Sequence, residues 1–462
     1  MRLATVHTVE DFLARLGGDI EGVEIYGDRS LHREDVGLAV VAEDPTGEIA
    51  SYVEEYLRPR GQAPDEVMQV HINGHDSFFG AIKSDSAIMR RLREFLSGSD
   101  TGIEAFNSNP DFECLVQRLR AMDPGTPMLG IPMSPPEKVA RVLDHKVLAR
   151  KLARDLGSEA VMTYAEHELA FDYDEARLQI WGCLKKYGRV MAKAGTFASG
   201  IGQLDVELNV PDEKIDAFLR RFMDPHEGLV VEQHVGKHFA GSVQWEFASE
   251  GYFRVFLSRQ LLISHPETKG GVHVGNVIAD KGGEIFPQDW PELCGHVAAE
   301  EAWHIHWCEL NWAQQHGYVG RLGADFMVVL REIRGKVVPV VYKCEFGGRV
   351  TGGTYINGVR VRANAHRPGT CVVGLNCEFN HDYYRGWRDV SAVLEATHLD
   401  DRDDVSMRPG SGRGVLVGLT RGLPRKCILF ACADSVPEAW EMQRVARKRL
   451  GATLYEIDSE SI

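Results

Sequence analysis

The sequence predicts a mixed fold, α/β in its first part and α+β after it, built from about three domain-sized units. The chain has 462 residues, and one domain holds roughly 150. Hydrophobic residues make up 44% and charged residues 26% of the chain, which is typical of a globular protein and excludes wholesale disorder. Short apolar, β-branched runs alternate with amphipathic segments near the N-terminus, and an apolar strand hairpin follows later.

The first domain-sized unit has an α/β pattern. Its expected strands are short, apolar and β-branched, and its expected helices have salt-rich outer faces. The strands are residues 36–42 and 67–72, and the helices are residues 86–96 and 112–122. The turn-rich stretch 124–132 then ends the unit, so we predict an α/β domain over residues 1–135.

A second region, residues 136–370, is predicted to be α+β. A helical run begins near Pro136, contains Lys146 and stops at Gly157. The remaining expected elements are strands at 190–193, 229–232 and 242–247, a long helix at 294–316, and a hairpin of strands 325–330 and 337–343. Residues 371–462 are predicted to form a smaller C-terminal lobe, because a polar stretch precedes a last strand–loop–helix unit.

Charge and cysteine content exclude several function classes. Lys and Arg total 52 against 67 Asp and Glu, a formal net charge of −15, which argues against a general affinity for nucleic acid or an anionic membrane. No window of about 18 uninterrupted apolar residues is present, and the N-terminal residues lack the apolar core of a signal peptide. The nine cysteines include no CxxC pair, as in reduced intracellular proteins. We therefore expect a cytoplasmic protein with no membrane or nucleic-acid partner.

A loop of small residues is the first candidate for phosphate binding. It follows a strand that ends at Lys193, and it contains Gly195, Ser199, Gly200 and Gly202. Glycines permit positive φ and close backbone approach, so consecutive N–H groups can face a phosphate, and the lysine adds a point charge. The loop matches neither a Walker A motif nor a Rossmann fingerprint. Taken alone, plain turn chemistry explains it equally well.

Two carboxylates on the predicted hairpin are candidate metal ligands. Asp325 lies on one strand and Glu345 at the end of the next, and neighbouring strands lie about 4.8 Å apart. Two carboxylates this close can share Mg²⁺, which is usually held by one or two carboxylates together with substrate phosphates. Arg349 follows Glu345 by four residues. For any one of these residues, a strand-end charge that faces water is the simpler interpretation.

The order of these residues resembles the ATP-grasp superfamily over about residues 140–360. In that family ATP binds between two α+β subdomains. Segments 144–146 and 191–193 resemble the family's two nucleotide lysines, and segment 230–235 resembles the hinge that recognises adenine. The resemblance implies nucleotide binding by Lys146, Lys193, Gly195, Ser199, Gly200, Gly202, Glu232, Gln233 and Val235. It also implies that Asp325 and Glu345 bind Mg²⁺, with two ions expected.

Within the superfamily, the chain is similar to peptide ligases of the pheganomycin type, which carry a pre-ATP-grasp α/β domain and a small C-terminal domain. Residues 320–326 resemble that family's Gly-Arg-Phe-x-x-Asp-Phe strand, and residues 414–439 resemble its closing unit. The chain departs from the pattern at two positions. Gly347 replaces the Asn of Glu-x-Asn-x-Arg, which helps to bind the second Mg²⁺, and Phe239 replaces the acidic residue that contacts the ribose.

The resemblance implies an ATP-dependent carboxylate–amine ligase that forms an amide or peptide bond through an acyl phosphate. The implied substrates are amino acids or short peptides, and the implied pathway makes a peptide-like natural product. Arg349 would hold the substrate carboxylate or acyl phosphate, with Arg321 and Arg259 as further anion contacts. Dimers are common in the superfamily, so a homodimer is considered. Two alternatives stay open. One is a non-catalytic ATP-binding protein, because Gly347 replaces a family residue that helps to bind Mg²⁺. The other is a ligase that uses a thiol in place of the amine.

Three other polar groups have simpler explanations. His304 and Cys308 are spaced to share a helix face as metal ligands, but no second pair matches them and nearby tryptophans indicate a packed helix. Residues 71–76 follow a strand, where α/β sheets bind ligands, but a turn explains them better. Residues 378–380 have the missing Glu-x-Asn spacing but lie far downstream of the hairpin.

Overall fold

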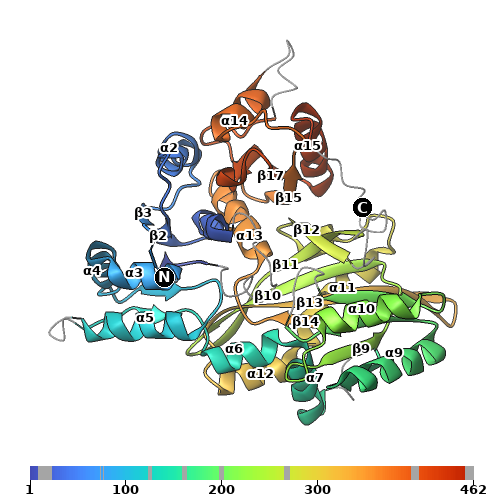
Figure 1. Cartoon of the computed structure of the whole chain (residues 1–462). Coiled ribbons are helices and arrows are strands. Elements are labelled where there is room, and N and C mark those ends of the chain that lie inside the picture. Colours follow the sequence, from blue (N-terminus) through green and yellow to red (C-terminus); the bar gives the residue numbers. More distant parts are fainter. Residues whose placement is uncertain are drawn as a thin grey trace.

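The computed structural model describes residues 1–8, 23–72, 74–75, 77–122, 127–158, 164–196, 202–264, 271–396 and 405–452. The described strands form three sheets, of five, eight and four strands. In Figure 1 the N-terminal sheet (blue) lies at the left and the four-stranded sheet (green) at the lower right, with the strands of the eight-stranded sheet between and above them. This arrangement of a parallel sheet followed by antiparallel sheets confirms the predicted fold class.

The N-terminal unit is a parallel sheet in the order β3-β2-β1-β4-β5. Its strands are β1 (Arg2–Thr5), β2 (Val36–Ala42), β3 (Glu66–Val70), β4 (Thr101–Glu104) and β5 (Ile131–Pro132). Its helical segments are η1 (Val23–His32), α2 (Glu48–Ser51), η2 (Tyr52–Leu57), η3 (Arg58–Arg60), α3 (Phe78–Ser84), α4 (Ser86–Phe95) and α5 (Pro110–Ala121). Alternate residues of β2 enter two separate core clusters, so both faces of the sheet are covered, as parallel sheets require. The strand predicted at 36–42 and the helices predicted at 86–96 and 112–122 are confirmed.

The four-stranded sheet is antiparallel and has the order β6-β9-β7-β8. Its strands are β6 (His167–Ala170), β7 (Arg189–Ala194), β8 (Gln203–Glu207) and β9 (Leu229–Gln233). Helices α9 (Tyr173–Tyr187) and α10 (Asp212–Phe222) pack their apolar residues against one face in a shared core. In β7 every second residue is buried, so Lys193 and Met191 lie on the face opposite to that core.

The eight-stranded sheet has the order β14-β13-β10-β11-β12-β15-β17-β16. Its strands are β10 (Phe239–Ala248), β11 (Gly251–Ser264), β12 (Gly271–Ile278), β13 (Gly320–Ile333), β14 (Lys336–Gly347), β15 (Cys371–Glu378), β16 (Gly414–Gly418) and β17 (Lys426–Ala433). Its accompanying helical segments are η4 (Gly282–Ile285), α13 (Gly352–Asn364), α14 (Trp387–Glu395), η5 (Thr420–Gly422) and α15 (Val436–Arg449). Because β12 pairs with β15, the sheet continues across the predicted boundary at residue 370. The division into domains 1–135, 136–370 and 371–462 stays a prediction.

Two of the predicted helices are each interrupted. The run from Pro136 to Gly157 forms α6 (Glu137–Asp144) and α7 (Lys146–Asp155), because His145 is extended at φ −89° and ψ 115°. The ring of His145 accepts a hydrogen bond from the Leu148 N–H and so caps α7. The expected helix at 294–316 likewise forms α11 (Glu292–His304) and α12 (Trp307–Gln315). The apolar spacing continues across both breaks, so spacing alone does not reveal them.

A buried network of charges, which we call the junction network, joins the N-terminal sheet to the eight-stranded sheet. Arg33 Nε donates to Glu104 at 2.9 Å, and its Nη1 pairs with Glu34 at 2.8 Å. Arg321 pairs with Glu34, and its Nε also donates to Glu246 at 2.7 Å. The side chains of Arg33, Glu104, Glu34 and Arg321 are all buried, so the junction is held by ion pairs shielded from water.

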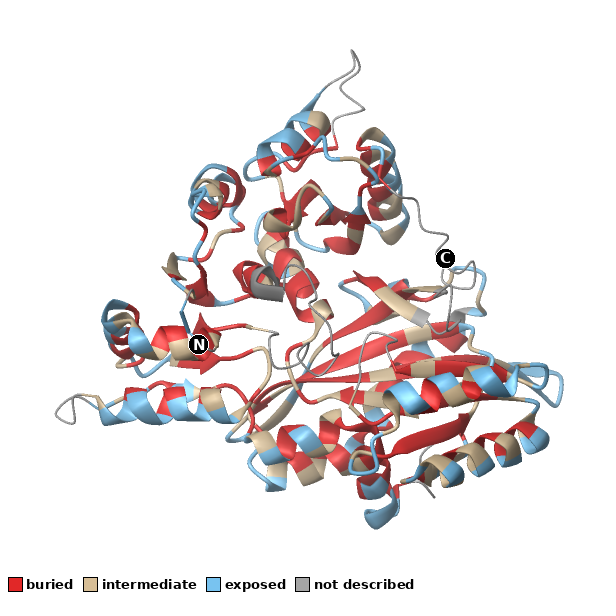
Figure 2. Cartoon of the chain, viewed as in Figure 1, coloured by how far each residue is buried: buried red, intermediate tan, exposed pale blue. Residues whose placement is uncertain are grey.

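Most strand residues are buried, and the helices that cover the sheets expose one face. Figure 2 shows mostly buried strands in the eight-stranded sheet, whereas helices α9 and α10 alternate buried and exposed residues along their lengths. Within the described ranges, no helix has both the length and the apolar character needed to cross a membrane.

Candidate active site

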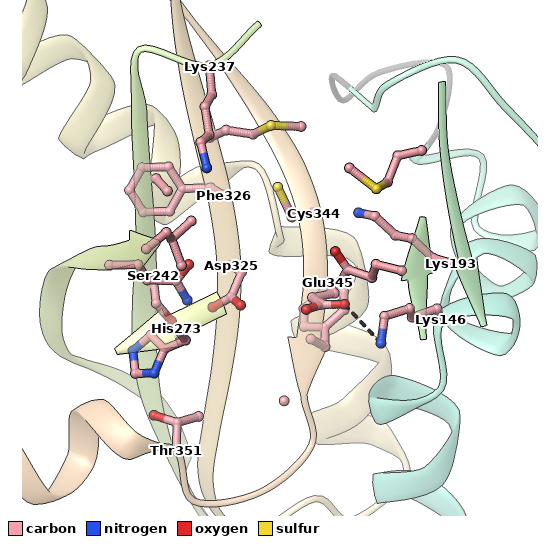
Figure 3. A pocket seen from close by; sticks show the side chains of 18 of the residues that line it. Lys146, Lys193, Lys237, Ser242, His273, Asp325, Phe326, Cys344, Glu345 and Thr351 are labelled. Atoms are coloured by element: carbon pink, nitrogen blue, oxygen red, sulfur yellow. Dashed lines mark ion pairs between the residues drawn. The ribbon is translucent and has the colours of Figure 1, made fainter. Parts of the chain in front are cut away.

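A cavity of about 780 Å³ lies between the four-stranded and the eight-stranded sheets. Figure 3 shows Lys146 and Lys193 on one side of it, with Asp325 on the opposite strand and Glu345 between them. The cavity brings together eight residues that the sequence predicts for the site: Lys146, Lys193, Glu232, Gln233, Val235, Asp325, Glu345 and Arg349. These residues come from segments up to about two hundred positions apart, so the fold assembles them.

A turn and a bulge in the β13–β14 hairpin position the two carboxylates. Arg334 and Gly335 both have positive φ, at 54° and 74°, as a two-residue hairpin turn of type I′ requires. The pairing register then shifts next to Asp325, so that this single residue lies opposite both Cys344 and Glu345. The bulge lets consecutive residues of β14 face the cavity, and it aims Glu345 at Lys146.

Lys146 stands at the first turn of α7, and its Nζ lies 3.1 Å from Glu345 Oε2. Burial alone would raise the pKa of Glu345, but attraction to Lys146 and Lys193 outweighs burial and lowers it. Glu345 is therefore held as a carboxylate. The backbone N–H of Lys146 also donates to the Gly195 carbonyl at 2.9 Å, which ties α7 to the start of the small-residue loop.

Asp325 has the opposite electrostatic character. Burial raises its pKa to about 7, and repulsion from the neighbouring Glu345 adds to the rise. Hydrogen bonds from Gln260 and Ser242 offset only part of it. A divalent cation would relieve the repulsion between these two carboxylates, so this donor set fits Mg²⁺. Among the described residues, no group of three or more His, Cys, Asp and Glu side chains could hold a metal, so phosphates and waters would supply the other ligands.

Glu232, on β9, pairs with two cations. Its carboxylate pairs with Lys193 Nζ at 2.5 Å and with Arg150 Nη2 at 3.0 Å. Burial opposes ionisation, but these two cations outweigh it and lower the pKa of Glu232 to about 2. Attraction to Glu232 likewise outweighs burial and raises the pKa of Lys193. The lysine is thus charged and held at the cavity wall, where a phosphate can replace part of its pairing.

Arg349 lies two residues after the end of β14, close to Glu345 in the sequence. It pairs with Asp144, the last residue of α6, and its guanidinium lies 5.9 Å from the centre of the Phe106 ring. Burial lowers the pKa of Arg349 to about 10, so it stays charged near neutral pH. A planar cation beside Glu345 suits a carboxylate or an acyl phosphate.

The structure does not bring Arg321 or Arg259 to the cavity. Arg321 belongs to the junction network and pairs with Glu34 and Glu246. Arg259 lies between two cavity-lining residues of β11, so it points to the other face of the sheet, where it contacts the Phe239 ring. The prediction that these two arginines contact the substrate anion gains no support from their positions. From the sequence, both arginines are identified only as strand residues. The alternation of side chains along each strand and the tertiary contacts show that they lie away from the cavity.

The small-residue loop is described only at its ends. Gly195 and Gly202 both make backbone hydrogen bonds but do not line the cavity, and Ser199 and Gly200 lie outside the described residues. A Cβ at Gly195 would lie 2.5 Å from the ring of His145, so only glycine fits this close approach. The phosphate-binding role predicted for the loop stays a prediction.

The two departures from the family pattern have clear structural settings. Gly347 lines the cavity, and a Cβ there would lie 3.3 Å from the Thr351 methyl group, so glycine leaves space for the cap of α13. Phe239 is buried and stacks on Phe286 at 4.4 Å between ring centres, so it belongs to the core. Its neighbour Lys237 lines the cavity instead.

Several cavity residues carry no signal in the sequence alone. Ser242, Gln260, His273, Asn276 and Cys344 lie on four different strands, and no motif in the sequence connects them. His273 and Asn276 are three residues apart on β12, so alternation alone would place them on opposite faces. A register shift next to Leu261 brings both to the cavity, and the sequence does not reveal that shift. Arg29 also lines the cavity from η1, far away in the sequence.

The other polar groups predicted to have simpler explanations lie away from the cavity. His304 is on α11 and Cys308 on α12, and His304 Nδ1 donates a hydrogen bond to the Glu300 carbonyl at 2.6 Å. His71 pairs with Glu43, while Asp76 lies outside the described residues. Residues 378–380 line a separate shallow pocket, so they do not complete the Glu345 motif.

Comparison with known proteins shows the fold. Biotin carboxylase from Campylobacter jejuni, in a β,γ-ATP complex, matches with a TM-score of 0.53 and 11% identity over 100% of this chain and 93% of that one. Carboxyaminoimidazole ribonucleotide synthase from Aspergillus clavatus, complexed with ATP, matches with a TM-score of 0.51 and 11% identity over 97% and 98%. The chain has the ATP-grasp fold. No protein-family model and no curated protein sequence matches it.

The ATP-grasp fold explains why the cavity lies between two antiparallel sheets, as the sequence resemblance implied. The matches extend over the whole length of the chain, including the N-terminal sheet and the C-terminal strands. The similarity to pheganomycin-type ligases is untested by them and stays a prediction.

Proposed function

We propose that the protein is an ATP-dependent ligase that joins a carboxylate to an amine, with ADP and phosphate as co-products. The observation that supports it most is the charge arrangement of one cavity: two lysines, two adjoining carboxylates and an arginine. The proposal extends to amino acids or short peptides as substrates and to a peptide-like natural product.

In the first step, an oxygen of the substrate carboxylate attacks the γ-phosphorus of ATP, and the bond to the β–γ bridging oxygen breaks. This gives an acyl phosphate and ADP. Lys146 and Lys193 neutralise phosphate charge, and Arg349 orients the carboxylate through its planar fork. Asp325 and Glu345 would hold Mg²⁺, which when bound supplies charge neutralisation at the phosphates.

In the second step, the neutral amine nitrogen attacks the acyl carbon, the carbon–oxygen bond to phosphate breaks, and the nitrogen loses a proton. Water is the competing nucleophile, so the burial of Lys146 and Glu232 in a cavity between two sheets is important for yield. Gln233 and Val235, at the end of the cavity next to β9, bind the adenine.

A hydroxylamine assay tests this proposal without knowledge of the acceptor. Hydroxylamine replaces the amine and converts an acyl phosphate into a coloured hydroxamate. Purified protein with ATP and Mg²⁺ is screened against pools of common amino acids and short peptides as donors. We expect ADP and hydroxamate in equal amounts with at least one pool. ATP binding without ADP formation in every pool would favour the non-catalytic alternative. Products with N-acetylcysteamine, a thiol without a free amine, but not with amines would favour a thiol ligase.

A further inference from the structure

Three consecutive residues where α6 meets α7 attach to both sheets that enclose the cavity. Asp144 and Lys146 each pair with a side chain at the end of β14 or just after it, at the edge of the eight-stranded sheet. His145 lies between them in the sequence and pairs with Glu227, in the turn before β9 of the four-stranded sheet. The break between the two helices therefore connects the two walls of the cavity.

The two ring nitrogens of His145 make different hydrogen bonds. Nδ1 accepts from the Leu148 N–H at 3.3 Å, so Nδ1 carries no proton. Burial outweighs the attraction to Glu227 and lowers the pKa of His145, so the ring is neutral near neutral pH and its single proton lies on Nε2. Nε2 then donates to the carboxylate of Glu227. One nitrogen therefore caps α7, and the other holds Glu227.

The backbone of Gly195 continues the same connection. The Lys146 N–H donates to the Gly195 carbonyl at 2.9 Å, and the Gly195 N–H donates to the Gly228 carbonyl at 3.2 Å. A Cβ at Gly195 would lie 2.5 Å from the His145 ring, so the ring lies directly against this backbone. Because Gly195 follows Lys193 by two residues, a short chain of contacts joins Lys146 to Lys193.

Lys146 and Lys193 lie on the same side of the cavity, where Figure 3 shows both side chains. His145 and Glu227 are not among the residues that line the cavity. Any effect of His145 on a bound nucleotide must therefore pass through the residues that it holds in place, and the two lysines are the cations among them.

We propose that His145 and Glu227 form a positioning pair, which sets the separation of Lys146 and Lys193 so that both reach the phosphates of one nucleotide. This inference rests on the nucleotide binding of the proposed function, and it assigns His145 no contact with the nucleotide. The competing explanation is that His145 only caps α7.

Two substitutions separate the positioning role of His145 from its capping role. Asn places its amide near the position of Nδ1, so His145→Asn keeps a good cap but is too short to reach Glu227. Gln places its amide near the position of Nε2, so His145→Gln can still donate to Glu227 but caps α7 poorly. The two roles therefore predict opposite orders of nucleotide affinity for these variants.

Calorimetric titration with ADP in the presence of Mg²⁺ measures the effect without turnover. We expect His145→Asn to weaken ADP binding by about 10-fold while its melting temperature changes little, because one charge-assisted hydrogen bond is lost. His145→Gln is expected to stay within about threefold in affinity but to melt at a lower temperature. Asp172→Ala is the matched control, because it removes the side-chain cap of α9, which packs on the face of its sheet opposite to Lys193. It is expected to lower the melting temperature without changing ADP affinity.

The order of the two affinities decides the inference. Weaker ADP binding by His145→Asn than by His145→Gln supports it, and equal affinities or the reverse order overturn it. If either variant does not fold, Glu227→Ala decides the question, since it leaves the cap of α7 intact. A loss of about 10-fold in ADP affinity then supports the positioning pair. Unchanged binding, or an equal loss in Arg141→Ala, which removes the other partner of Glu227, overturns it.

The same measurements separate this inference from the proposed function. Absence of ADP binding to the unaltered protein would overturn both. ADP binding with the expected order of variants, but no hydroxamate with any donor, would overturn the ligase reaction alone.

Discussion

The cavity and the junction network both gather charged residues, which are buried in the network and partly exposed in the cavity, and their charges are balanced in different ways. In the junction network, each carboxylate has its cation: attraction to Arg33 and other partners outweighs burial and lowers the pKa of Glu104 to about 2, and the pKa of Glu34 is lowered as well. In the cavity, Asp325 faces Glu345 and its pKa is raised to about 7. The comparison teaches that paired charges occur in both places, and that Asp325 differs because a like charge lies beside it and raises its pKa.

The largest expected effect concerns stability at the junction. Arg321→Ala leaves Glu34 buried with one cation fewer, and we expect a loss of about 3–5 kcal/mol in the free energy of unfolding. Urea unfolding followed by fluorescence measures it. Arg90→Ala, an exposed arginine on α4, is the control and is expected to stay within about 0.5 kcal/mol. If Arg321→Ala instead keeps its stability and loses substrate affinity, the junction role is wrong and the original anion-binding prediction stands.

The next effect concerns catalysis in the cavity. Glu345→Gln removes one of the two adjoining carboxylates, and we expect turnover to fall by about 100- to 1000-fold while the melting temperature changes little. Glu332→Gln, on the exposed part of the hairpin, is the matched control. Full activity in a folded Glu345→Gln protein would remove the metal assignment.

The smallest effect is a pH dependence of stability. Glu104 has a pKa of about 2 in the folded protein, below the value of about 4.3 in an unfolded chain. Its contribution to stability is therefore fully present above about pH 5 and is lost as pH falls toward about 2. We expect Glu104→Gln to be less stable at neutral pH but to lose stability less steeply on acidification. Denaturant unfolding across that range checks the slope, and an unchanged slope would contradict the ionisation assigned to Glu104.

Much of the fold could be predicted from the sequence, and the reasons are local. The strand at 36–42 is a continuous apolar run, and the hairpin turn at Arg334-Gly335 needs residues that accept positive φ. The break at His145 was not predictable, because that residue is extended only where α7 meets the small-residue loop. Pairing of β12 with β15, which carries the large sheet past residue 370, depends on contacts between distant segments.

The candidate site could be predicted in part. The predicted site residues follow the order of the ATP-grasp pattern along the sequence, and the cavity contains five of them: Lys146, Lys193, Asp325, Glu345 and Arg349. Arg321 and Arg259 have the same residue type in similar strands, and only register and burial place them away from the cavity. Arg29 had no signal, because no motif connects η1 to the hairpin.

Transfer of a labelled oxygen tests the central claim most directly. A donor with ¹⁸O at both carboxylate oxygens is incubated with the protein, ATP and an amine, and the released phosphate is analysed by mass spectrometry. If Lys146, Lys193, Asp325 and Glu345 serve the activation of that carboxylate, one ¹⁸O atom passes to phosphate for each amide formed. Amide formation with phosphate that carries no ¹⁸O would contradict an acyl phosphate and the role assigned to the cavity.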